Sequence, residues 1–370
     1  MTMDKTILKR EEAAVFALRE LYCRYGYTPY RMSKFEAYEF YLQNKEFLVS
    51  DRIITFHDTD GELMALKPDV TLSIVKNGTD APGCIQRSYY NENVYRVSGS
   101  SHQFREIMQT GLECIGDLDF YEIYEVILLA ARSLACIAEE YVLDVSHLGL
   151  LGAILDETGA DESFRQQAAR CIAEKNAHDL QPLCRAAGVS AEVTDKLTAF
   201  VGIYGEMECV LQRLSPLCTT REEQSALRQL QALASLLQAT PYAGNIHFDF
   251  SIVNNMKYYS GFVFKGFLRG VCQGVLAGGQ YDKLMVRLGR SARAIGFALY
   301  LDLLDELEEQ TDGLDVDVLL LYDAATPPQM LAAKIEALQQ AGRRVSAQRA
   351  VPEKLRYETV IDLRKEAAEC

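Results

Sequence analysis

The segment VYRVSGSSHQFREIMQTGLECIG, residues 94–116, has the pattern of a β-hairpin around a short Gly/Ser loop. Because side chains alternate between the two faces of a strand, Gln109 and Glu113 are expected on one face of the second strand. Arg96 stands in the first strand, close to the loop. The hairpin therefore predicts a surface with an amide and a carboxylate on its floor and a cation at its mouth.

The segments around this hairpin also have clear patterns. Apolar residues at helical spacing predict a helix over residues 11–25. Two apolar runs in RIITFHDTDGELMAL (52–66) flank a strong turn signal and predict a second hairpin. LKPDVTLSIVKNG (66–78) predicts a helix that starts close to Pro68, and FYEIYEVILLAARSLACIAEEY (120–141) predicts a long amphipathic helix.

The composition changes near residue 146, where Ala, Leu, Gln and Glu begin to dominate and predict a block of helices. Strand-forming residues return in IHFDFSIVNNMKYYSGFVFKGF, residues 246–267. An acidic linker then precedes VDVLLLYD, a helical pattern and RRVSAQR, which predict a β-α-β unit. The expected organisation is one mixed core formed by residues 1–145 and 245–310, a helical insertion at 146–244, and a small C-terminal unit at 311–370.

Composition excludes several classes of protein. The chain has 370 residues, 49% of them hydrophobic, and a formal charge of -14, which disfavours tight binding to nucleic acid. No two of the ten cysteines have a C-x-x-C spacing, and the five histidines show no metal-ligand spacing, so no metal or cofactor is expected. There is no P-loop, no complete dinucleotide-binding motif and no apolar segment long enough to span a membrane. We expect a cytoplasmic protein.

Four motifs occur in one order: LKPDVT, YR followed by a loop and FREIMQTGLECIG, NNMKYYSGFVF, and AGGQYDKL with AIGFALYLDLL. This ordered set resembles the catalytic core of histidyl-tRNA synthetase over roughly residues 5 to 305. The resemblance implies an α+β fold of the class II synthetase type, with a six-stranded antiparallel sheet flanked by helices. It also implies that the small C-terminal unit is a truncated relative of an anticodon-binding domain.

The resemblance further implies a histidine pocket. Its candidate residues are Asp69, Thr71, Gln109, Glu113, Tyr258 and Tyr259. Each also has a simpler interpretation, because Asp69 could cap a helix and the hairpin residues could form a solvated strand face. Adjacent tyrosines on a strand point to opposite faces, so at least one of Tyr258 and Tyr259 is expected to pack in the core.

The sequence departs from the synthetase pattern where ATP would bind. Arg96 keeps the first arginine of the second motif, but Gln103, Asn254 and Leu303 stand where the family has three other arginines. Ser98 and Lys257 replace two acidic residues, and Tyr300 replaces a small residue and would fill nucleotide space. A triphosphate needs several fixed cations, so catalytic residues are not expected.

A synthetase-like pocket without nucleotide contacts is similar to that of the ATP phosphoribosyltransferase regulatory subunits. That resemblance implies a non-catalytic subunit that enables a short-form ATP phosphoribosyltransferase, the enzyme of the first step of histidine biosynthesis, and confers feedback by L-histidine. It implies a homodimer within a hetero-oligomer and no tRNA or membrane partner. A divergent histidyl-tRNA synthetase and a stand-alone histidine-binding module remain as alternatives.

Overall fold

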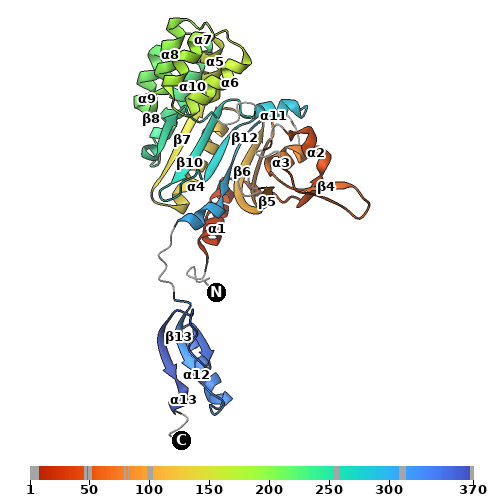
Figure 1. Cartoon of the computed structure of the whole chain (residues 1–370), viewed down its shortest axis with the longest axis vertical. Helices are drawn as coiled ribbons and strands as arrows, with labels where there is room; N and C mark the ends of the chain where they lie inside the picture. The colour runs from red at the N-terminus through yellow and green to blue at the C-terminus, as the bar shows by residue number, and fades with distance from the viewer. Residues whose placement is uncertain are drawn as a thin grey trace. The chain divides into compact units, whose positions relative to one another are not determined.

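The computed structural model describes residues 8–45, 48, 52–78, 81, 83–97, 103–253, 258–307 and 314–366 (Figure 1). The chain divides into two compact units, Met1–Leu307 and Glu308–Cys370. Within these described ranges, no helix is both long enough and apolar enough to cross a membrane.

The larger unit is built on a sheet of nine strands in the order β1-β5-β6-β12-β11-β10-β7-β9-β8, counted over the described ranges. The strands in this order are Thr28–Pro29, Ile85–Val97, Phe104–Gly116, Arg293–Tyr300, Leu276–Gln280, Phe262–Leu268, Tyr141–His147, Ile246–Asp249 and Tyr204–Glu206. The six strands from β5 to β7 all pair antiparallel. At the edges, β1 pairs parallel with β5 and β9 pairs parallel with β7, whereas β8 pairs antiparallel with β9. The predicted antiparallel sheet flanked by helices is confirmed, with added strands at both edges.

Helices α1 (Arg10–Arg24) and α4 (Phe120–Ile137) pack against each other and against this sheet. The Tyr22 hydroxyl lies 3.0 Å from Ser133 Oγ, inside the apolar layer that the two helices share with the strands. The predicted helix at 120–141 is therefore correct for most of its length but wrong at its end. It stops at Ile137, because the β-branched run that follows pairs as strand β7.

A small sheet of order β2-β4-β3 precedes the long hairpin, with strands Phe35–Ala37, Leu63–Leu66 and Thr55–His57. The predicted β3–β4 hairpin is confirmed, and its turn is held by Asp58, whose carboxylate accepts hydrogen bonds from the backbone N–H of Asp60 and Glu62. Helix α2 (Tyr38–Gln43) follows β2, and α3 (Thr71–Asn77) follows β4 as the sequence predicts.

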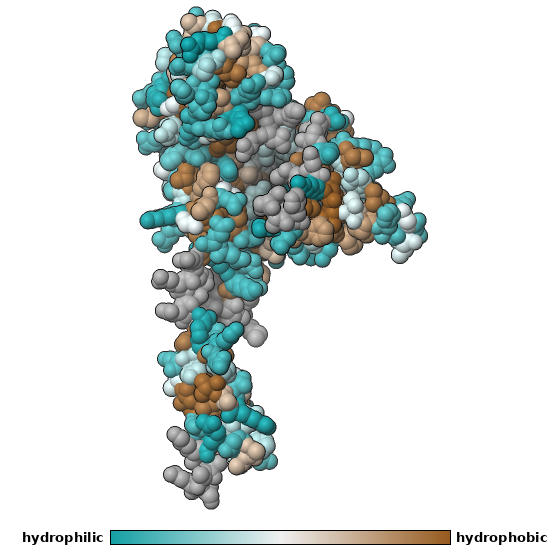
Figure 2. All heavy atoms as spheres, viewed as in Figure 1, coloured by the Kyte–Doolittle hydropathy of each residue, from teal (hydrophilic) through white to brown (hydrophobic). Residues whose placement is uncertain are grey.

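The segment between β7 and β9 is mostly helical, as predicted. Its helices are α5 (Leu148–Asp156), α6 (Glu162–Ala173), α7 (Ala177–Ala186), α8 (Ala191–Val201), α9 (Met207–Leu214) and α10 (Arg221–Gln238). They gather beside the β7 and β8 edge of the sheet (Figure 1), and most of their visible surface is hydrophilic (Figure 2). The block also contains β8, which extends the central sheet through β9.

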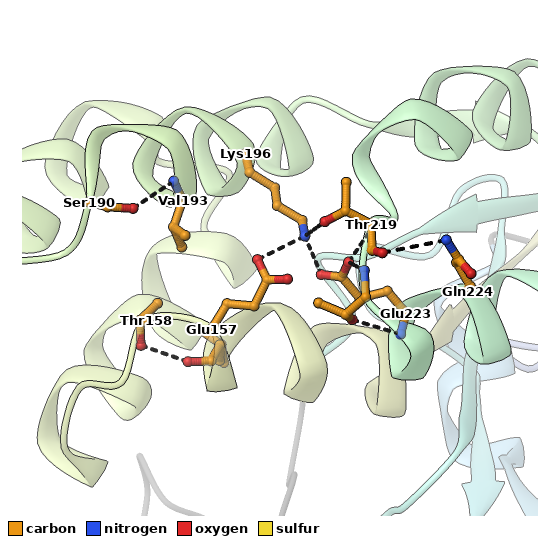
Figure 3. A network of polar contacts seen from close by, with 10 residues as sticks. Glu157, Thr158, Ser190, Val193, Lys196, Thr219, Glu223 and Gln224 are labelled. Atoms are coloured by element: carbon orange, nitrogen blue, oxygen red, sulfur yellow. Dashed lines mark hydrogen bonds and ion pairs between the residues drawn. The ribbon is translucent and has the colours of Figure 1, made fainter.

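A buried ion-pair network ties three of these helices together (Figure 3). Lys196 of α8 pairs with Glu157, which follows α5, at 2.9 Å, and with Glu223 of α10. The Glu223 side chain is fully buried and also accepts hydrogen bonds from the backbone N–H groups of Thr219 and Thr220. Burial raises the Glu223 pKa, but the Lys196 and backbone hydrogen bonds outweigh it and hold that pKa below its usual value.

The smaller unit is a parallel sheet of order β14-β13-β15, formed by Val345–Gln348, Val316–Leu321 and Tyr357–Asp362. Helix α12 (Pro328–Gln340) connects β13 to β14 and covers an apolar layer around Val318 and Leu320, and α13 (Leu363–Glu366) follows β15. The predicted β-α-β unit is confirmed, and β15 adds a third strand to it.

Candidate functional site

A cavity of about 340 Å³ lies on the face of the central sheet. Its lining comes from strands β5, β6, β11 and β12, from the start of α3, from the residues before β10, from Tyr281 and from Leu48. All seven retained positions predicted from the sequence line it, namely Asp69, Thr71, Arg96, Gln109, Glu113, Tyr258 and Tyr259.

The long hairpin forms the floor of this cavity. Gln109 pairs with Glu92 and Glu113 with Ser88 in an antiparallel register, which places the Gln109 and Glu113 side chains on one face. Gln109 and Glu113 are both buried, with only 2% of each residue's surface exposed. The alternative of a solvated strand face is therefore wrong.

Glu113 is held by two hydroxyl groups. Thr71 Oγ1 donates to one carboxylate oxygen at 2.7 Å, and the Tyr281 hydroxyl donates to the other at 2.5 Å. Burial raises the Glu113 pKa to about 8, although both hydrogen bonds oppose the shift, and the nearby Asp69 adds to it. Glu113 is thus a carboxyl group whose pKa lies well above the usual acidic range.

Gly296 allows the carboxylate to sit this close to the neighbouring strand. Gly296 of β12 pairs directly with Glu113, and a Cβ placed there would lie 1.8 Å from a Glu113 carboxylate oxygen and 2.5 Å from the Leu112 carbonyl. A larger residue at 296 would displace the carboxylate.

Asp69 caps the start of α3 and also lines the cavity. Its carboxylate accepts a hydrogen bond from Leu72 N at 2.9 Å, in the first turn of α3, and the same side chain lines the cavity. Burial raises the Asp69 pKa, and the backbone bonds and the charge of Arg96 counteract part of this shift. The carboxylate is therefore anchored on one side and faces the cavity on the other.

Arg96 supplies the positive charge. Its Nε donates to the Pro68 carbonyl at 3.0 Å, and its charge opposes the rise that burial causes in the pKa of the Tyr300 hydroxyl. Among the described lining residues, Arg96 is the single cation, whereas Asp69 and Glu113 are both acidic. The cavity therefore carries one positive and up to two negative charges.

Gln109 contributes a polar group without a protein partner. Within the described part of the chain, its amide nitrogen is buried and makes no hydrogen bond. An unpaired buried donor costs about 1–3 kcal/mol, and a bound ligand with an acceptor would remove this cost. The amide is thus a candidate ligand contact.

The two adjacent tyrosines lie together, so the expectation that they point to opposite faces is wrong. The expectation that at least one of them packs in the core is confirmed by Tyr258, which is 8% exposed and belongs to a buried apolar cluster. Residues 258–260 precede β10 and are not in strand conformation, so both rings line the cavity, in edge contact at 4.6 Å and 76°. Strand alternation does not apply to a turn, and the sequence pattern does not show where the strand begins.

The three lost arginine positions stand apart from this cavity where they are described. Gln103 is exposed just before β6, and Leu303 packs on the core from the 3-10 helix Leu301–Glu306. Asn254 lies outside the described residues, as do Ser98 and Lys257. Among the described residues, no group of three or more His, Cys, Asp or Glu could hold a metal ion.

Sequence reasoning missed Tyr281 and Tyr90, which are both about 1% exposed and line the cavity. Tyr281 follows the AGGQ segment just before α11 (Asp282–Arg287), and only its fold-dependent contact with Glu113 reveals a role. Its position inside the quoted AGGQYDKL motif is the one sequence signal that points to it.

Six antiparallel strands with a small, charged cavity on their face define a protein of the class II aminoacyl-tRNA synthetase type. The chain belongs to the histidyl-tRNA synthetase family, whose model matches residues 4–304. The predicted resemblance and fold class are confirmed by this match.

Individual relatives are consistent with the family. The ATP phosphoribosyltransferase regulatory subunit of Oceanobacillus iheyensis is 27% identical over 281 residues, which cover 75% of this chain and 69% of the relative. A crystal structure of an ATP phosphoribosyltransferase regulatory subunit/histidyl-tRNA synthetase from Bacillus halodurans superposes with a TM-score of 0.77 at 21% identity, covering 98% of this chain and 99% of the other. A chain of the ATP phosphoribosyl transferase (HisG:HisZ) complex from Thermotoga maritima superposes with a TM-score of 0.62 at 19% identity. The superposition covers 80% of this chain and 98% of the other.

Proposed function

We propose that this chain is the regulatory subunit of a short-form ATP phosphoribosyltransferase, without catalytic activity of its own, and that its cavity binds L-histidine. The relative from Oceanobacillus iheyensis carries this name, and the fold is shared with a chain of the Thermotoga maritima complex. The proposal places the chain in the cytoplasm, as a homodimer within a hetero-oligomer. It also assigns residues 1–145 and 245–310 to the core, 146–244 to the insertion, and 311–370 to the truncated unit.

The observation that carries the proposal is the set of charges in the cavity. An amino acid brings one ammonium and one carboxylate, and the lining residues that the structure describes offer Asp69, Glu113 and a single cation, Arg96. The Tyr258 and Tyr259 rings meet edge to face and give an apolar surface with polar ends, which suits an imidazole. Within the described residues, Gln109 adds an unpaired donor. A cavity of about 340 Å³ is at the lower end of ligand sites, which suits a single amino acid.

The same charges argue against catalysis. Activation of histidine with ATP would require several fixed cations around the triphosphate and its developing charge. Arg96 is the one cation among the described lining residues, and its Nε already donates to the Pro68 carbonyl. We therefore expect binding without adenylate formation.

Reconstitution tests the regulatory role. We expect a short-form ATP phosphoribosyltransferase to gain activity when this chain is added, and to lose that gain when histidine is added. No change in activity on mixing would contradict the regulatory role. It would leave a stand-alone histidine-binding module, provided that calorimetry still detects histidine.

Pyrophosphate exchange tests the absence of catalysis. We expect the purified chain to give no histidine-dependent exchange with ATP and no charging of tRNA. Robust exchange would instead identify a divergent histidyl-tRNA synthetase.

A further inference from the structure

A second cavity, of about 220 Å³, adjoins the ligand cavity. Tyr259, Ala277 and Tyr300 line both cavities. Because the side chain of Ala277 is small, the rings of Tyr259 and Tyr300 form most of the wall that separates the two cavities. The second cavity also contains a cation, Lys265 of β10.

Tyr300 is held in this wall by the sheet. It ends β12, where it pairs with Gln109 of the cavity floor, and its backbone N–H donates to the Val275 carbonyl at 2.8 Å. Arg96, which is fixed to the Pro68 carbonyl, lines the same cavity, and its charge opposes the rise that burial causes in the Tyr300 pKa. The backbone of Tyr300 is therefore fixed at the boundary between the two cavities.

The position of the cation orients the ligand. The lining residues that the structure describes contain one cation, Arg96, and two acidic groups, Asp69 and Glu113, which offer a carboxylate no positive partner. An amino acid's carboxylate therefore belongs beside Arg96. Tyr300 lines the same cavity as that guanidinium, whose charge opposes the rise that burial causes in the Tyr300 pKa. A ligand extended beyond its carboxylate would meet the Tyr300 ring, and beyond the ring it would meet the second cavity.

We propose that Tyr300 is a specificity-determining residue that restricts the cavity to free amino acids and excludes ligands extended at the carboxyl end, such as amides, esters and peptides. This inference rests on the proposed binding of histidine. Once the ring is removed, the second cavity becomes part of the site, and Lys265 becomes available to an anionic end group. The fold thus contains space for a longer ligand, which Tyr300 closes off.

Calorimetric titration with histidine and with the dipeptide histidyl-glycine tests the proposal. We expect the wild-type chain to bind histidine at least about a hundredfold more tightly than the dipeptide, because the extended end collides with a fixed ring. Tyr300→Ala should bind the dipeptide at least about tenfold more tightly than the wild type does. Tyr300→Phe keeps the ring and should still exclude the dipeptide.

Lys265 provides a matched control. The dipeptide ends in a carboxylate that would reach Lys265 in the joined cavity, so Tyr300→Ala/Lys265→Ala should lose most of the gain. Tyr300→Leu also removes the aromatic ring. It serves as the test variant if Tyr300→Ala does not fold. Equal binding of histidine and dipeptide by the wild type, or no gain in a folded Ala or Leu variant, overturns the inference. Absence of histidine binding by the wild type would instead contradict the proposed function.

Discussion

Replacement of Lys196 by methionine should destabilise the helical segment strongly. Methionine preserves the apolar stem of the lysine but removes the charge that pairs with Glu157 and Glu223. The Glu223 side chain has no exposed surface, so its carboxylate would be left buried with only backbone donors. Loss of one partner of a buried ion pair costs about 3–5 kcal/mol.

The two backbone N–H groups that remain on Glu223 place the expected loss at the lower end of this range, about 3 kcal/mol. Urea unfolding followed by circular dichroism would measure it. At a slope of about 2 kcal/mol per molar urea, the midpoint of the helical transition should fall by about 1.5 M. Lys196→Met/Glu223→Gln should recover most of the loss, since a glutamine oxygen still accepts from the backbone and leaves no buried charge.

The effect should also depend on pH with a definite sign. In the wild type, the Glu223 pKa is lowered, so its stabilising contribution is present above its usual pKa of 4.5 and is lost as the pH falls through the lowered value. In Lys196→Met, the lysine charge that opposes the effect of burial is gone, so burial raises the Glu223 pKa. The folded variant therefore takes up a proton on Glu223 as the pH falls. The stability gap between variant and wild type should therefore narrow from pH 8 to pH 5. A constant or widening gap, or a loss below about 1 kcal/mol, would refute the reasoning.

Three further predictions concern the cavity. Glu113→Ala should weaken histidine binding about tenfold or more, because a charge-assisted contact contributes about 1.5–3 kcal/mol. Calorimetry of the isolated chain and of the complex measures this affinity. If the affinity is unchanged in both, the effector site lies elsewhere. The Glu113 pKa is raised from 4.5 to about 8, so the folded state holds a proton that the unfolded state has lost, and the ligand-free wild type should lose stability as the pH rises between these values. Thermal unfolding of Glu113→Gln should lack this decline, and a parallel decline in both proteins would show that another group is responsible. Gly296→Ala should displace Glu113, destabilise the chain by about 1–3 kcal/mol and reduce histidine affinity, and a variant with wild-type stability and affinity would contradict the 1.8 Å approach.

Local patterns in the sequence were sufficient for the floor of the site. The alternation in the hairpin placed Gln109 and Glu113 on one face, and the proline before α3 placed Asp69 and Thr71 near a helix start. Such signals are local because strand alternation and helix entry depend on a few neighbouring residues. Boundaries were less certain, and the end of α4 was misplaced because apolar residues suit both a helix and the strand that follows.

The sequence by itself determined the order of elements, the hairpin faces and the family. The tertiary structure alone decided that Tyr258 and Tyr259 share one cavity, that Tyr281 holds Glu113, and that Tyr300 separates two cavities. The physical reason is the distance along the chain. Tyr281 and Glu113 are 168 residues apart, and their contact exists only because β12 brings the segment after β11 beside β6. No local period records a contact of that kind, since it depends on how the strands are ordered in the sheet.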